Sequence, residues 1–190
     1  MPGTLAKAGL ALIALVTAAT SAQPQTRHRY EHERDRPPKE VERPAPPPSV
    51  DKRDSVVTAV GGFNGRPYWL ALAQCGGIYF KLNVLYTGIA VQARAVKPDP
   101  KINAEYTRKL NEAISDATAF FNGADQFLAT DRGLERTDAV LTYDEQSRAA
   151  GERVKTVAEA LAAAKACPVL YQACQQALPK ACGAVLVPTS

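Results

Sequence analysis

Histidine is almost missing from this chain of 190 residues. Its two histidines, His28 and His32, lie in a charged, proline-rich stretch near the N-terminus, and residues 51–190 have none. That segment therefore lacks the commonest general base, the usual partner of serine and cysteine nucleophiles, and the commonest zinc and copper ligand. We expect a protein that is not an enzyme and that holds neither a cofactor nor a metal ion.

The cysteines lack the spacing of a metal or redox site. Zinc sites, thioredoxin-like redox centres and c-type haem attachments usually carry a CxxC pair. Here the four cysteines are Cys75, Cys167, Cys174 and Cys182, without such a pair and without a nearby histidine. An even number of cysteines in an exported chain predicts two structural disulfides.

The sequence also lacks a strong charge imbalance. After the N-terminal leader, residues 1–22, it has no long uninterrupted apolar run. The net charge of the whole chain is +4, which is too small and too dispersed for a nucleic-acid-binding surface. The most apolar stretch, residues 68–96, is interrupted by Lys81, Asn83 and Arg94, among other polar residues. We therefore expect no nucleic-acid partner, and no membrane span once the leader has been removed.

The leader, residues 1–22, has the three-part order of a secretory signal peptide. Lys7 supplies the positive start, Leu10–Val16 is apolar, and the small residues Thr20–Ala22 follow. We predict cleavage after Ala22 and a periplasmic or secreted protein. Retention of the leader as a membrane anchor is the alternative.

Two further segments follow the leader. Residues 23–50 are rich in charge and proline and nearly free of large apolar side chains. Such a segment cannot bury enough surface to offset its ordering entropy, so we predict a disordered linker. Residues 51–190 are then one domain of ordinary size.

Apolar residues recur at helical spacing through most of this domain, and no stretch alternates as a strand does. The pattern predicts an all-α fold, a small bundle of three long helices and a short C-terminal helix. We place the long helices at about residues 67–94, 100–129 and 137–167, and the short one at about 168–178. Asp99 is the expected N-cap of the second helix.

The first helix is apolar around most of its circumference, which is typical of a helix at the centre of a bundle. Gly76 and Gly77 interrupt it at a cost of about 1 kcal/mol each relative to alanine. We expect them to permit either a close backbone contact or a kink. A second patch of small residues, Ala149–Gly151, could let another helix approach closely.

The helical pattern also limits the disulfide pairing. If Pro168–Leu178 is helical, Cys167 and Cys174 lie about 10 Å apart, beyond the reach of a disulfide. The preferred pairing is Cys75–Cys167 with Cys174–Cys182. The alternative is Cys75–Cys174 with Cys167–Cys182.

These features predict an exported, non-enzymatic helical protein that acts as a binding or accessory module of the cell envelope, with a protein partner. The alternative hypothesis is a carrier of a small apolar or aromatic ligand in a pocket within the bundle. Its lining, which would equally serve partner contacts, would include Trp69, Tyr79, Tyr86 and Phe120. As large apolar residues of helices, these four are interpreted first as core.

Overall fold

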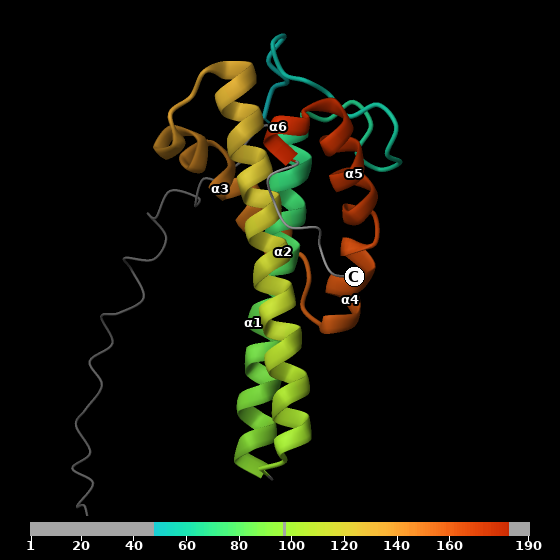
Figure 1. Ribbon diagram of the computed structural model, residues 1–190, viewed down its shortest axis with the longest axis vertical. Coiled ribbons are helices and arrows are strands. Elements are labelled where there is room, and N and C mark those ends of the chain that lie inside the picture. The colour runs from blue at the N-terminus through green and yellow to red at the C-terminus, as the bar shows by residue number, and fades with distance from the viewer. Residues whose placement is uncertain (1–47, 97, 183–190) are drawn as a thin grey trace, which may run out of the picture. The chain divides into compact units, whose positions relative to one another are not determined.

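The computed structural model describes residues 48–96 and 98–182 (Figure 1). The predicted signal peptide and nearly all of the predicted linker lie outside these residues. Within them the fold is all-α, as predicted, with no strand and one isolated bridge between Val56 and Pro67. The six helices of this part of the chain are α1 (Tyr68–Val96), α2 (Pro100–Arg132), α3 (Arg136–Glu152), α4 (Val157–Ala164), α5 (Cys167–Ala177) and α6 (Pro179–Cys182).

The two longest helices, α1 and α2, pack side by side as an antiparallel hairpin (Figure 1). Local sequence fixes both ends of α2. The Asp99 side chain accepts a hydrogen bond from the backbone N–H of Lys101 at 2.8 Å, and Pro100 occupies the first helical position. At the other end Gly133 adopts φ 68° and donates its N–H to the Ala129 carbonyl.

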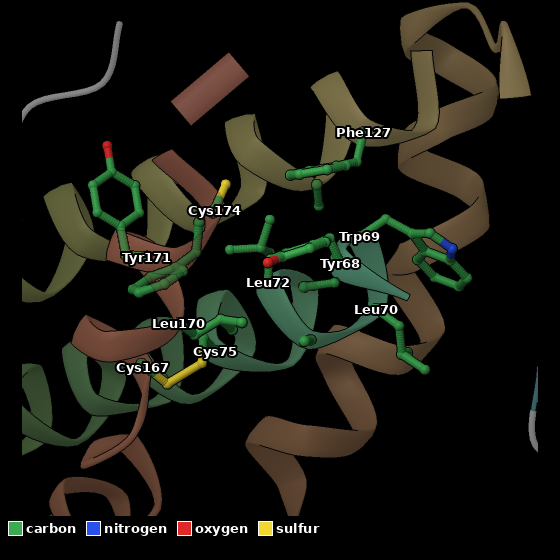
Figure 2. Packing of buried hydrophobic residues seen from close by; sticks show 14 of the residues in the cluster. Tyr68, Trp69, Leu70, Leu72, Cys75, Phe127, Cys167, Leu170, Tyr171 and Cys174 are labelled. Carbon is green, nitrogen blue, oxygen red and sulfur yellow. A yellow bond between two sulfur atoms is a disulfide. The ribbon is translucent and has the colours of Figure 1, made fainter. Parts of the chain in front are cut away.

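The predicted centre of the bundle is confirmed, because α1 contacts α2, α3, α4 and α5. Figure 2 shows side chains of α1, α2 and α5 meeting in the main core. The Tyr68 ring stacks on Phe127 with centroids 4.7 Å apart, and Leu170 and Tyr171 enter from α5. The core is therefore built on the first three turns of α1.

Three consecutive residues of α1 each contact a different helix. Cys75 forms a disulfide with Cys167 at the start of α5. A Cβ atom on Gly76 would collide with the Phe121 ring of α2, and one on Gly77 would overlap the Ser147 carbonyl oxygen of α3. Of the two alternatives predicted for the glycine pair, the close backbone contact is therefore present.

The small-residue patch of α3 completes this contact. A Cβ atom on Gly151 would lie 2.9 Å from the carbonyl oxygen of Gly77. The backbones of α1 and α3 thus approach each other directly, as the sequence suggested for Ala149–Gly151. Such an approach is open only to glycine at these positions.

The second disulfide joins Cys174 to Cys182, so the pairing is the one preferred from the sequence. The Cα atoms are 5.8 Å apart in the first bridge and 6.0 Å in the second, both within the usual range. The first bridge spans 92 residues of sequence and ties α5 to the central helix.

The predicted third long helix is wrong, because α3 and α4 are separate helices. Thr156 caps α4 by accepting the Glu159 N–H at 3.2 Å, and Glu159 accepts the Lys155 N–H at 2.7 Å. This Thr-x-x-Glu sequence is a capping signal that outweighs the apolar periodicity running across it. The break lets the chain leave α3 and place Ala160 of α4 in a second core cluster with Leu82 of α1 and Ala113 of α2.

The segment before α1 is fixed by a buried ion pair. The Arg132 guanidinium donates hydrogen bonds of 2.7 and 2.6 Å to the two oxygens of Asp54, and Trp69 Nε1 donates to Asp54 at 3.4 Å. Burial alone would raise the pKa of Asp54, but the hydrogen bonds, chiefly from Arg132, lower it below its usual value. The residues leading into α1 are thereby held against the end of α2.

The α1–α3 contact gives a direct stability test. Gly77→Ala should destabilise the domain by about 3 kcal/mol, because its Cβ meets a helix backbone that cannot rotate away. Gly88→Ala in the same helix is the matched control, since nothing lies within 4 Å of its added Cβ. That control should gain about 0.5–1 kcal/mol. Urea unfolding of both variants measures the difference, and equal effects would contradict the contact.

Candidate functional site

One cleft lies where α1, α2 and the α4–α5 connection meet. It has a volume of about 280 Å³. Its apolar wall consists of Tyr79, Leu82 and Tyr86 from α1, Ala113 from α2, and Leu161 from α4. These residues belong to helices that are themselves held by the Cys75–Cys167 bridge and the α1–α2 hairpin.

The structure brings together two of the four aromatic residues proposed to line a pocket. Tyr79 and Tyr86 line the cleft, while Phe120 is fully buried behind it and stacks on Tyr79 with centroids 5.5 Å apart. Trp69 lies elsewhere, buried beneath the Arg132 guanidinium. Phe120 and Trp69 are therefore core residues, and fluorescence of Trp69 would not report directly on this cleft.

Asp116 is the residue that sequence reasoning missed. It lines the cleft, is only 6% exposed, and has no hydrogen bond or ion pair in the described part of the chain. Its position was visible in the sequence, because Ala113, Ala117 and Phe120 place it within the inward-facing stripe of α2. A carboxylate in such a stripe usually has a partner.

Burial raises the pKa of the Asp116 carboxyl to about 6, and the charge of nearby Glu112 adds to the rise. The pKa of Tyr79 is raised to about 12, first by its burial and then by the charge of Asp116. The tyrosine hydroxyl and the carboxylate are thus electrostatic neighbours in the cleft.

The other charged groups at the cleft have different partners or lie at its rim. Lys109 pairs with Glu105 at 2.6 Å and lies over the Tyr86 ring, 5.7 Å from its centroid. Glu112 accepts from Arg108 at 2.6 Å. Lys165 is an exposed residue at the rim.

A second hollow, of about 440 Å³, lies between α1 and α3. We call it the α1–α3 groove; its apolar lining comes from Gly77, Phe80, Val84 and Phe121. Phe80 and Val84 are 50% and 46% exposed, although both are large apolar residues. Gly77 and Gly151, whose backbones meet in the α1–α3 contact, both line the groove.

The described helices offer neither a membrane span nor a metal centre. None of them is long and apolar enough to cross a bilayer. In residues 48–96 and 98–182 no group of three or more His, Cys, Asp or Glu side chains could hold a metal ion.

Comparison with known proteins adds no homologue, since no protein-family model, curated protein or solved structure matches this chain.

The raised pKa of Asp116 predicts a pH-dependent stability change. The pKa of Asp116 is about 6 in the folded domain, above the ordinary value of 3.8. The stability that the protonated carboxyl contributes is therefore fully present below about pH 4 and is lost as the pH rises through 6. Asp116→Asn should therefore stabilise the domain by about 2–3 kcal/mol near pH 8 and by little near pH 4.

Urea unfolding at both pH values measures this effect. Glu145→Gln is the matched control, because Glu145 is exposed and should change stability by less than about 0.5 kcal/mol at either pH. A loss of stability in Asp116→Asn at the higher pH would show that the carboxylate has a stabilising partner.

Proposed function

We propose that this protein is an exported, non-enzymatic binding module of the cell envelope that holds an amphipathic helix of a partner protein in the α1–α3 groove. Export is supported by the signal-peptide pattern of residues 1–22 and by the two disulfides, which persist in oxidising compartments. The absence of histidine from residues 51–190 supports binding rather than catalysis.

The observation that carries the proposal is the half-exposed apolar pair Phe80 and Val84 on the lining of a groove. They lie one helical turn apart on α1, and Phe121 of α2 adds a third apolar side chain beside them. Concave apolar surface of this kind is typical of interaction sites, whereas single exposed apolar residues are common everywhere.

The dimensions of the groove favour a helix as the occupant. Its α1 side runs from Gly77 to Val84, about 10 Å or two helical turns. Charged residues of both signs border the apolar lining, including Lys81, Arg148 and Glu152. A partner helix with a two-turn apolar face and charged flanks matches this arrangement.

A small molecule fits the groove less well than a helix. Small-ligand sites usually combine an apolar lining with a few polar groups that fix the orientation of the ligand. The buried polar side chain on the groove lining, Ser147, already donates to the Asp144 carbonyl, so it is not free to orient a small molecule.

Site-specific photo-crosslinking in the native host tests the proposal. A photoreactive phenylalanine analogue at position 80 should form a discrete adduct whose cross-linked peptide is an amphipathic helix. The same analogue at position 169 is the matched control, because Val169 on α5 is 51% exposed but lies outside the groove. No adduct of this kind is expected from position 169.

A charge placed in the groove supplies the second half of the test. Val84→Glu should abolish the adduct from position 80, because a carboxylate would be buried against the apolar face of the partner. Val169→Glu should leave it unchanged. Equal cross-linking from positions 80 and 169, or an adduct that survives Val84→Glu, would contradict the proposal.

A further inference from the structure

The Asp116 cleft has a feature that partner binding in the α1–α3 groove does not explain. Asp116 is more than nine-tenths buried, lines the cleft, and has no hydrogen bond or ion pair in the described residues. The Asp116 oxygens are not among the fully buried polar atoms, so they reach the surface of the cleft that the residue lines. A carboxylate that is largely desolvated and lacks a protein partner is costly. A cleft that holds such a group is therefore suited to a ligand that supplies the missing partner.

We infer that the cleft between α1, α2 and the α4–α5 connection binds a small organic ammonium ion with an aromatic or apolar body. The ammonium group would donate a hydrogen bond to the Asp116 carboxylate. Such charge-assisted hydrogen bonds are about twice as strong as neutral ones. The body would lie between Tyr79 and Tyr86 and against Leu82 and Leu161.

The aromatic wall favours a cation over a neutral ligand. The electron-rich faces of tyrosine rings attract ammonium groups within about 6 Å of the ring centroid. One face of Tyr86 is already occupied by Lys109, whose Nζ lies 5.7 Å from the ring centroid, so Tyr79, the electrostatic neighbour of Asp116, is the ring offered to the ammonium group of the ligand. Lys109 is also paired with Glu105, so it is not available to Asp116 as its main partner.

The size of the cleft limits the ligand to about one ring and a short arm. Its volume is about 280 Å³, and a cavity of about 150 Å³ already holds benzene. The phenethylammonium ion has a single ring, a two-carbon arm and one ammonium group, so it is a suitable probe. Its neutral and anionic analogues, 2-phenylethanol and phenylacetate, have similar shape and differ in charge.

Calorimetric titration of the disulfide-bonded mature chain near pH 8 tests the inference, because Asp116 is then ionised. Phenethylammonium should bind at least about tenfold more tightly than 2-phenylethanol, and phenylacetate should not bind. NMR should locate the bound ligand by shifts of the Tyr79 and Tyr86 ring signals, with the Trp69 indole unchanged.

Asp116→Asn removes the negative charge and keeps nearly the same side-chain shape, so it distinguishes the effect of the charge on ligand affinity from that of the shape of the cleft. This variant should reduce phenethylammonium affinity to the level of the alcohol, while Glu145→Gln should leave it unchanged. Equal binding of the ammonium ion and the alcohol, or full affinity in Asp116→Asn, would overturn the inference. Circular dichroism of each variant confirms that the helices remain folded.

Lys165 at the rim of the cleft could compete with the ammonium ion of the ligand for the Asp116 carboxylate. If its side chain reaches Asp116 in solution, the carboxyl pKa measured by NMR will fall below 3.8 and Lys165→Gln will be required for ammonium binding. Either result would overturn the inference for the natural chain. A carboxyl pKa that starts near 6 and falls as phenethylammonium is added would support it.

Discussion

One turn of α1, from Cys75 to Gly77, holds three other helices. Successive residues of a helix point about 100° apart, so these three neighbours face three sides of α1. Cys75 binds α5 covalently, Gly76 leaves room for Phe121 of α2, and Gly77 admits the backbone of α3. The groove is lined by Gly77 and Gly151 of the glycine contact, and the cleft is lined by Pro168, which follows the disulfide-bonded Cys167.

Much of the fold follows from the sequence, because its causes are local or periodic. The apolar circumference of residues 68–96 identified the central helix, and Asp99 identified the start of α2. The glycine pair identified the close contact. The division between α3 and α4 was missed, because apolar periodicity continues across a break that Thr156 and Glu159 create by capping.

The candidate site was less predictable, since it depends on where neighbouring helices stop covering one another. Periodicity marks Tyr79, Tyr86 and Phe120 alike as inward-facing, yet only the two tyrosines reach the cleft. Whether Asp116 has a partner depends on the path of α4 and α5, which follows the unpredicted break. The apolar periodicity of α2 puts Asp116 on the inward face of that helix, but it does not indicate which residues of the other helices lie opposite.

Native mass spectrometry of the protein recovered from the envelope of its own host tests the central claim, an exported and doubly disulfide-bonded binding protein. The account predicts a chain that starts at Gln23, is four hydrogens lighter than its reduced form, and carries a partner or ligand that is released on denaturation. A chain that retains residues 1–22, has four thiols open to alkylation and carries no bound species would contradict it.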